Sequence, residues 1–322
     1  MTQRFNIADL NAIETRVGAW VAGCEPLLRV FAEHRDPYLD FAAKMYGIPY
    51  DTLWADYKGK NGKDRQIAAK RMRQTAKPGV LGAIYRLGGG GWGRDKNGDR
   101  IKTGLWGYAE AMGVDMSQEQ SHDVVKIFRE AYKEIPEFWI ILENAIMDVL
   151  KHERTIRKVG PSGCIVIDKL NIEDRQPLLR IQLPSGRYLH YMDSAIEIVS
   201  MPWKRKNPDT GEEEQVFRPA FTYYGVDQDT KIWTMIVSHG GKTFENIVQG
   251  VARDVLADKL LEFEDMGLQV VGHFHDEGAA LSDDDPFTPG AIEMEATMSQ
   301  PVYWAKSLPL GAEAFESRFY HK

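Results

Sequence analysis

The sequence predicts an α+β protein in which a long helical segment interrupts segments that form β-strands. Residues 26–155 are dominated by helical periodicity, whereas later segments alternate apolar and polar side chains between turn residues. A hydrophobic content of 43% over 322 residues is enough for a sizeable core. These observations favour strand, helical insertion, sheet, helix and hairpin in that order, in one large domain or two closely packed ones.

The first expected element is a short strand at residues 5–9 that runs into a helix. Ile13, Val17 and Trp20 recur at helical spacing, and Gly23 follows as a stop. The helical segment is expected to be interrupted twice, by the lysine- and glycine-rich stretch at 58–63 and by the four glycines at 88–91. The four glycines are interpreted as flexible backbone.

The remaining elements are expected from residue 156 onward. GCIVID, LLRIQL, RYLHYMD and AFTYYGVD predict antiparallel strands, and a helix is expected at roughly 243–266. The stretch VVGHFHDEGAA at 270–280 then predicts a hairpin with His275, Asp276 and Glu277 at its tip. Because Asp, Glu and Gly are common in turns, this tip is also compatible with a purely structural role.

Composition and charge limit the classes of function. No apolar run approaches the roughly 18 residues of a membrane span, no signal peptide is recognisable, and only two cysteines are present. A cytoplasmic protein with no membrane partner is therefore expected. The net charge is −7, yet residues 55–102 carry thirteen Lys and Arg against four Asp and Glu. This block predicts a local polyanion site or, alternatively, a solvated lysine-rich loop.

Two further clusters have residue types suited to nucleotide chemistry. Asp9 lies at the end of the first strand, where a helix begins. Its carboxylate either faces a cleft or caps the N-terminus of the helix. In the predicted helix at 65–85, Arg73, Lys77, Leu81 and Tyr85 are four residues apart and fall on one stripe. The stripe suits a triphosphate and a stacked base, or it is a solvated amphipathic face that Pro78 kinks.

A combination of the clusters points to metal-assisted phosphoryl chemistry. If Asp9 and Asp276 converge, they supply the carboxylates for two Mg²⁺ ions about 3.5–4 Å apart. Such ions activate an attacking hydroxyl and neutralise a leaving pyrophosphate, while the basic helix holds the triphosphate.

Four motifs in this order resemble those of family A DNA polymerases, the bacterial DNA polymerase I group, and most closely its phage members. They are ADLNAIETR, RQTAKPGVLGAIYRLG, ENIVQGVARD and HFHDEG. The resemblance covers essentially all 322 residues, but only as palm and fingers. It implies a palm at 1–25, helical fingers at 26–155, and a palm at 156–322 that holds the sheet, the DNA-contacting helix and the catalytic hairpin.

The resemblance also implies a role for individual residues. Asp9 and Asp276, with the Leu10 carbonyl, would bind two Mg²⁺ ions, for which Mn²⁺ can substitute, and Glu277 would support them. Glu14 would be the steric gate against a ribose 2′-OH. The residues assigned to the dNTP are Arg73, Lys77, Leu81, Tyr85 and Tyr38, with Lys77 as proton donor to pyrophosphate. The residues assigned to primer–template DNA are Arg16, Gln249 and His275.

Several features depart from the family pattern. Leu81 stands where an aromatic residue is expected, Arg86 replaces the glycine after Tyr85, and Tyr38 stands where many members have a histidine. The thumb, the early palm strands and the 3′–5′ exonuclease are missing before Asp9. A split polymerase is therefore expected, in which a second polypeptide supplies the thumb and the exonuclease, with an internally initiated product or a truncation as the alternative.

Other functions compete with the polymerase interpretation. SHGGKT after a strand-like run is close to a P-loop NTPase motif, although Ile236 occupies the position of its first glycine. A polymerase-like subunit that binds DNA without extending it, and a related RNA polymerase, are the remaining alternatives. A zinc site through His273, His275 and a cysteine lacks usable ligand spacing.

Overall fold

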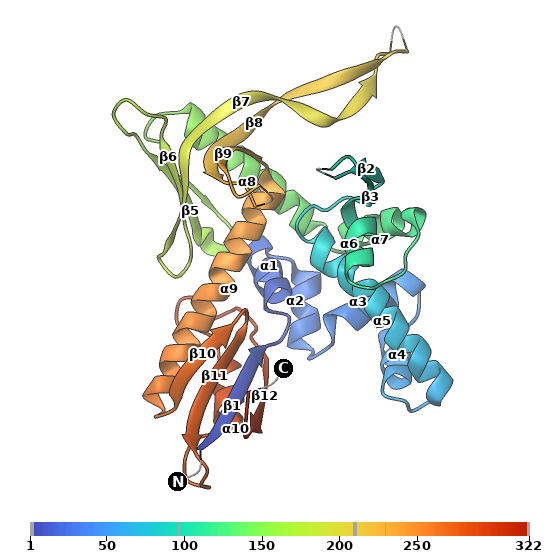
Figure 1. The fold of residues 1–322 in the computed structure, drawn as a ribbon, viewed down its shortest axis with the longest axis vertical. Coiled ribbons are helices and arrows are strands. Elements are labelled where there is room, and N and C mark those ends of the chain that lie inside the picture. The colour runs from blue at the N-terminus through green and yellow to red at the C-terminus, as the bar shows by residue number, and fades with distance from the viewer. Residues whose placement is uncertain (1–2, 96, 209–210, 229, 321–322) are drawn as a thin grey trace. The chain divides into compact units, whose positions relative to one another are not determined.

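The computed structural model describes residues 3–95, 97–208, 211–228 and 230–320. The chain divides into two compact units, one comprising Met1–Pro136 with Val248–Lys322 and the other comprising Glu137–Ile247. Both units contain helices and antiparallel strands (Figure 1), so the α+β prediction is confirmed. The division into units differs from the three expected segments, because the helical segment shares the first unit with both ends of the chain.

A four-stranded antiparallel sheet organises the first unit, in the order β10-β11-β1-β12. The strands are β1 (Gln3–Leu10), β10 (Gln269–Phe274), β11 (Glu277–Asp283) and β12 (Ala312–Ser317). Ile7 and Ala8 of the inner strand β1 are fully buried, as expected for a strand covered on both faces. The helix α10 (Ala291–Met298) packs on β1 and β12.

The helix α9 (Gly240–Asp265) begins in the second unit, and its later turns pack on β11 in the first (Figure 1). The contact depends on Gly278, because a Cβ there would lie 2.9 Å from Leu260 and 3.2 Å from Phe263. The hairpin prediction is confirmed for β10 and β11, with a turn at His275 and Asp276. Glu277 is not at the tip as predicted but is the first residue of β11.

Helices form most of the remainder of the first unit. They are α1 (Ile13–Ala22), α2 (Glu25–Ala32), α3 (Pro37–Tyr46), α4 (Tyr50–Tyr57), α5 (Lys63–Ala83), α6 (Gly104–Ala111), α7 (Gln118–Ala131) and the start of α8 (Glu134–Lys151). Gly23 ends α1 in the left-handed conformation, with φ of 64°, as the sequence predicts. Phe41, Phe128 and Tyr132 form the aromatic core between α3 and α7, with ring centroids 5.1–6.2 Å apart.

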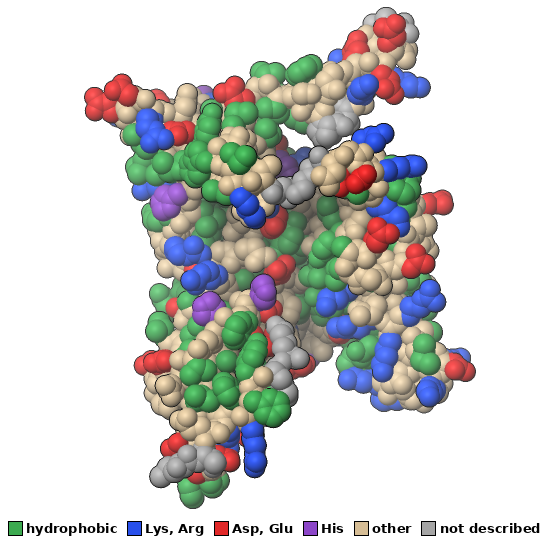
Figure 2. Space-filling model, in the orientation of Figure 1, with side chains coloured by type: hydrophobic (Ala, Val, Ile, Leu, Met, Phe, Trp, Pro, Cys, Tyr) green, Lys and Arg blue, Asp and Glu red, His purple; other side chains and the backbone are tan. Residues whose placement is uncertain are grey.

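The long helix α5 carries the predicted basic stripe. It runs through Pro78 without ending there, and the next residue, Gly79, is also buried. A Cβ at Gly79 would lie 2.6 Å from Val124 and 3.1 Å from Phe41, so the glycine lets α5 approach α3 and α7 closely. Lys and Arg side chains gather over α4 and α5 in Figure 2.

The four glycines at 88–91 are a tightly held connection rather than the flexible backbone that was predicted. The carbonyls of Gly88 and Gly89 accept hydrogen bonds of 2.8 and 3.0 Å from Leu105 and Trp106, at the start of α6. Gly91 pairs with Thr103, whose N–H donates to its carbonyl at 2.9 Å. This pairing continues into a short hairpin formed by β2 (Trp92–Arg94) and β3 (Arg100–Lys102). The hairpin was not predicted.

The second unit contains a six-stranded antiparallel sheet in sequential order. The strands are β4 (Arg157–Val159), β5 (Ile165–Leu170), β6 (Leu178–Gln182), β7 (Tyr188–Lys206), β8 (Glu213–Val226) and β9 (Trp233–Ser238), with a short 3₁₀ helix (Pro161–Gly163) between the first two. The strands predicted after residue 156 are thus confirmed, although β7 and β8 extend well beyond the predicted segments. This sheet is separate from the one that contains the catalytic hairpin candidate.

Within the residues that the structure describes, no helix combines the length and the apolar character required to cross a bilayer.

Candidate active site

Two aspartates from opposite ends of the sequence lie at neighbouring backbone positions at one end of the four-stranded sheet. In the β1–β11 ladder, Asp9 lies directly opposite Glu277. One residue further along, the N–H of Leu10 donates to the Asp276 carbonyl at 3.0 Å. This register brings Asp9 and Asp276 to neighbouring positions, and both side chains are partly exposed.

The local conformation explains why both aspartates lie at the end of the sheet. The strand β1 ends at Leu10, and the N-cap position of α1 belongs to Ala12, whose φ of 50° turns the chain into the helix. Asp9 is therefore not the helix N-cap that the sequence left open. His275, with φ of 57°, makes the tight turn that places Asp276 at the end of the hairpin.

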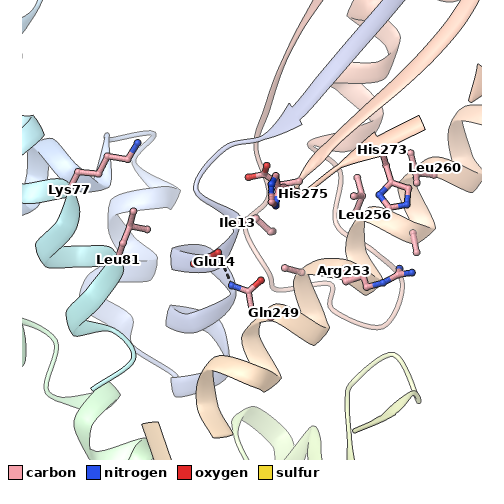
Figure 3. Close-up of a pocket in the computed structure, with 13 residues that line it drawn as sticks. Ile13, Glu14, Lys77, Leu81, Gln249, Arg253, Leu256, Leu260, His273 and His275 are labelled. Atoms are coloured by element: carbon pink, nitrogen blue, oxygen red, sulfur yellow. Dashed lines mark hydrogen bonds between the residues drawn. The ribbon is translucent and has the colours of Figure 1, made fainter. Parts of the chain in front are cut away.

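A cavity of about 890 Å³ opens beside Asp276 (Figure 3). The residues that line it come from α1, α5, α9 and the β10–β11 hairpin, all in the first unit. They are Ile13, Glu14, Lys77, Leu81, Gln249, Ala252, Arg253, Leu256, Ala257, Leu260, His273, His275 and Asp276. The lining of the cavity therefore combines apolar side chains with both acidic and basic ones, as is common for ligand sites.

Glu14 links two walls of the cavity. Its Oε1 accepts a hydrogen bond of 2.7 Å from Gln249 Nε2 on α9 (Figure 3), and its Oε2 accepts one of 3.2 Å from the Tyr85 hydroxyl just beyond α5. Both carboxylate oxygens are thus engaged, which fixes the orientation of the side chain. Tyr85 itself is not among the lining residues.

Two residues contact the basic stripe of α5: Asp36, which precedes α3, and Tyr38, which lies within it. Asp36 Oδ2 accepts a hydrogen bond of 2.9 Å from Arg73 Nε and forms an ion pair with Arg73 Nη2 at 2.8 Å. Burial lowers the pKa of Arg73, but the hydrogen bond and charge of Asp36 outweigh this effect and raise it. The Tyr38 ring lies 5.1 Å from the Arg73 guanidinium and 5.8 Å from Lys77 Nζ, a cation–π arrangement.

Asp36 and Tyr38 are also structural residues. Asp36 Oδ1 accepts a hydrogen bond of 2.8 Å from the Leu39 N–H and so caps α3. Tyr38 is largely buried, and burial raises the pKa of its phenol to about 12. Of the predicted dNTP residues, Lys77 and Leu81 line the cavity, whereas Arg73 and Tyr38 do not.

Arg16 has a position unlike that expected for a DNA contact. Its Nε donates to the Asn11 carbonyl at 2.7 Å and its Nη1 to the Pro309 carbonyl at 3.0 Å. The guanidinium also lies 4.3 Å from the centre of the Phe31 ring, and burial lowers its pKa to about 10. Arg16 does not line the cavity, and its contacts join α1 to the C-terminal segment.

Glu277 is buried, with 2% of its surface exposed. Its Oε1 accepts a hydrogen bond of 2.9 Å from the Tyr320 hydroxyl, and the Tyr320 ring packs on Phe274 with centroids 4.9 Å apart. Partial burial and this hydrogen bond raise the pKa of Tyr320. Nothing in the sequence near Tyr320 indicated this contact, because it joins residues 43 positions apart.

The donor set at the end of β1 is compatible with a hard divalent cation. Mg²⁺ takes oxygen ligands and is commonly held by one or two carboxylates together with substrate phosphates. Asp9 and Asp276 offer carboxylates at neighbouring positions, and Leu10, which follows Asp9, hydrogen-bonds to the backbone of Asp276. Over the described ranges, no cluster of three or more His, Cys, Asp and Glu residues suits a metal, so a zinc centre receives no support.

The P-loop interpretation of SHGGKT is wrong. The first glycine of the pair, Gly240, already belongs to α9, and only His239 separates that helix from β9. One residue is too short to wrap a phosphate. The Gly240 N–H donates instead to Glu143 Oε2 at 2.9 Å, and Lys242 pairs with Glu245 at 3.2 Å.

Comparisons with known proteins agree with the fold and the motifs. The chain is 31% identical over 319 residues to the DNA polymerase of Bacillus phage SP02, which covers 99% of this chain and 41% of that protein. The structure of the POL domain of Pol1 from M. smegmatis, in complex with DNA primer-template and dNTP, matches with a TM-score of 0.52. That match has 13% sequence identity and covers 98% of this chain and 39% of the other. No family model matches the sequence.

These findings confirm the predicted resemblance to phage DNA polymerases and the polymerase fold. The chain spans about two fifths of the length of the phage relative.

Proposed function

We propose that this chain is the palm and fingers portion of a DNA-templated DNA polymerase. The proposal is supported by the similarity of its fold to a polymerase POL domain and by its resemblance to a phage DNA polymerase over almost its whole length. The reaction is the addition of deoxynucleotides to a primer 3′-OH with release of pyrophosphate. The observation that carries the proposal is that Asp9 and Asp276 lie at neighbouring backbone positions in the sheet, and that Asp276 lines a cavity together with Lys77 and Glu14.

In this proposal Asp9, Asp276 and the Leu10 carbonyl hold two Mg²⁺ ions, for which Mn²⁺ can substitute. Bound there, the ions would supply activation of the primer hydroxyl and charge neutralisation at the leaving pyrophosphate. Glu277 supports the arrangement from its buried position opposite Asp9. Within the described residues, the Asp276 side chain has no hydrogen-bond or ion-pair partner, so it is available as a ligand.

The remaining side chains bind and orient the reactants. Lys77 and Arg73 hold the triphosphate above Tyr38, and Lys77 gives a proton to the departing pyrophosphate. Leu81 and Tyr85 pack near the incoming nucleotide and its template base. Glu14, whose carboxylate is held by two hydrogen bonds, is the proposed gate that excludes a ribose 2′-OH.

Primer–template DNA is contacted in this proposal by Gln249 and His275, which line the cavity on the side of α9 and the hairpin. Arg16 fixes the start of α1 through its hydrogen bonds to the Asn11 and Pro309 carbonyls. In this proposal its remaining N–H groups contact the DNA. The deoxynucleotide substrate distinguishes the proposal from a related RNA polymerase, which has no need for a 2′-OH gate.

The thumb and the 3′–5′ exonuclease are proposed to come from a second polypeptide. The proposal is supported by the extent of the match, which leaves more than half of the phage relative outside this chain. Co-purification of tagged chain from its native host, followed by mass spectrometry, tests this part separately. Recovery of the chain within a longer polypeptide, or without any polymerase-related partner, would contradict it.

The central test is primer extension by Asp9→Asn and Asp276→Asn in the presence of Mg²⁺. Each variant is expected to lose at least about a hundredfold in extension rate, because the carboxylate charge at the metal site is removed. Affinity for primer–template DNA should remain near that of the unaltered chain. Asp51→Asn, at an exposed position on α4, is the matched control and should extend normally.

The outcomes separate the two leading functions. Extension near the unaltered rate in either site variant refutes the metal assignment. A chain that binds primer–template but extends no primer, even when the second polypeptide is added, supports the alternative of a polymerase-like DNA-binding subunit.

A further inference from the structure

The cavity has cationic side chains on two opposite sides. Lys77 projects from α5 on one side, and Arg253 projects from α9 on the other, with Glu14, Gln249 and His275 between them (Figure 3). Lys77 has a role in the proposed reaction as a triphosphate ligand. Arg253 has none, although it brings a second positive charge to the same cavity.

Arg253 is well placed to receive an anion. It follows Gln249 by four residues on α9, so both side chains project from the same face of the helix, about 6 Å apart along its axis. Its side chain is exposed, and it makes no ion pair or hydrogen bond with any residue that the structure describes. An arginine that lines a cavity without an acidic partner retains its full capacity for a phosphate.

His273 is the counterpart of Arg253 on the hairpin. It lies on β10, whereas His275 belongs to the turn that follows this strand, and both side chains line the cavity. His273 is exposed and, over the described ranges, has no hydrogen-bond partner. Figure 3 shows Arg253 and His273 on the same side of the cavity.

The two pairs therefore line one cavity in sequence away from Lys77. His275 immediately precedes Asp276, where the primer terminus is proposed to react, and Figure 3 shows Arg253 and His273 further from Lys77 than Gln249 and His275 are. Ala252, Leu256 and Leu260 of α9 add apolar side chains to the lining of the same cavity. Apolar and cationic side chains together suit a sugar–phosphate backbone better than a base edge.

We propose that Arg253, assisted by His273, binds a phosphate of the primer strand within its last few linkages. The proposal rests on the polymerase function and deepens it, because it assigns a primer-holding contact to the groove between α9 and β10. The contact positions the primer end at Asp276 and takes no part in bond formation.

The test uses a set of primers in which one of the last four phosphates in turn is replaced by an uncharged methylphosphonate. Dissociation constants are measured by fluorescence anisotropy for the unaltered chain, Arg253→Gln, Arg253→Lys and His273→Gln. Arg29→Gln, at an exposed position on α2 outside the cavity, is the matched charge control. Primer extension by the unaltered chain is recorded in the same preparation.

The unaltered chain is expected to lose about tenfold in affinity when one particular linkage is neutral, as for loss of a charged hydrogen bond. Arg253→Gln should bind the normal primer about tenfold more weakly and should no longer respond to neutralisation of that linkage. Arg253→Lys should recover part of the response, because the charge is retained. His273→Gln should have a smaller effect, and Arg29→Gln should match the unaltered chain.

Equal responses of Arg253→Gln and the unaltered chain at every linkage would overturn the inference, as would a response found only when template phosphates are neutralised. If the unaltered chain extends primers normally in those experiments, the polymerase function stands and only the phosphate contact fails. If the unaltered chain neither binds nor extends primer–template, both fall together.

Discussion

At the scale of single residues, the site depends on side chains that hold one another in place. Glu14 has a partner for each carboxylate oxygen, Gln249 on one side and Tyr85 on the other. Arg73 is held by Asp36, which also caps α3. Such contacts fix functional groups before a substrate binds, which reduces the entropy lost on binding.

Tyr85→Phe tests whether this fixation matters for sugar selection. The change removes the 3.2 Å hydrogen bond to Glu14 and keeps the ring. Since a hydrogen bond to a charged group contributes about 1.5 kcal/mol, we expect roughly a tenfold loss in preference for dNTP over rNTP. Steady-state incorporation of a single dNTP or rNTP measures the ratio.

The control for this change is Tyr46→Phe, which alters an exposed tyrosine of α3 outside the site. Glu14→Ala should reduce the preference by more than Tyr85→Phe does. An unchanged ratio in Glu14→Ala would remove Glu14 from sugar selection altogether.

Glu293 gives a prediction about stability and pH. Its Oε2 accepts a hydrogen bond of 2.8 Å from the Gly290 N–H at the start of α10, and this bond lowers the pKa of the carboxyl. A carboxyl with a lowered pKa stabilises the fold above its unfolded pKa, and the stabilisation is lost as pH falls through the folded value. Glu293→Gln should therefore cost about 0.3–1 kcal/mol at pH 7 and almost nothing near pH 3.

Thermal unfolding of both proteins across this pH range measures the difference. Because Glu293 is exposed, the effect should shrink in high salt. A difference that grows on acidification would show that the carboxylate is not stabilising in the folded protein.

At the scale of elements, glycines in the helical region allow close approach of neighbouring backbones. Gly90 has φ of 96°, and a Cβ there would lie 1.8 Å from the Thr103 carbonyl oxygen. His122 Nε2 is 2.9 Å from the Gly90 carbonyl, which adds a contact from α7. The run of glycines thus joins α5, α6 and α7 instead of separating them.

Gly90→Ala should destabilise the first unit by about 1–3 kcal/mol, because both its conformation and its surroundings exclude a methyl group. Gly88→Ala is a control from the same run, since a Cβ there would meet nothing within 4 Å. Chemical unfolding followed by circular dichroism compares the two. Equal stabilities of the two variants would contradict the close packing described at Gly90.

The elements were predictable where a local pattern decides them. The strand at 5–9, the helix that Gly23 ends and the hairpin around Asp276 all follow from spacing and turn residues. The glycine run was misjudged because its hydrogen bonds go to Thr103 and α6, which no local pattern specifies. The hairpin of β2 and β3 was missed for the same reason.

The candidate site was predictable in part. Asp9, Glu14, Lys77 and Asp276 are in motifs whose order and spacing carry the resemblance, and the structure brings Glu14, Lys77 and Asp276 to one cavity. The sequence does not indicate roles for Asp36, Arg253 and Tyr320, because their importance depends on neighbours that are distant in the sequence. His273 is indicated only as a zinc ligand without usable spacing. For Arg253 the sequence offers one signal, because the residue follows Gln249 by four positions and therefore lies on the same face of a helix.

At the scale of the whole molecule, charge is distributed unevenly along the chain. The net charge is −7, but residues 55–102 have thirteen Lys and Arg against four Asp and Glu. These residues include α5 and lie in the first unit together with the cavity. Local positive potential, and not net charge, determines attraction to a polyanion within a Debye length of about 10 Å at 0.1 M salt.

Primer–template affinity should therefore fall with salt even though the protein is acidic overall. If about five phosphates are neutralised, log K should decrease linearly with log salt with a slope near −4 to −5. Anisotropy titrations between about 50 and 300 mM KCl measure the slope. A double variant, Lys70→Gln with Arg71→Gln on the exposed face of α5, tests the contribution of the basic block against Arg29→Gln outside it. A slope near zero would mean that phosphate contacts do not dominate binding. If the double variant has the same slope as the unaltered chain, those contacts lie in the cavity and not on the outer face of α5.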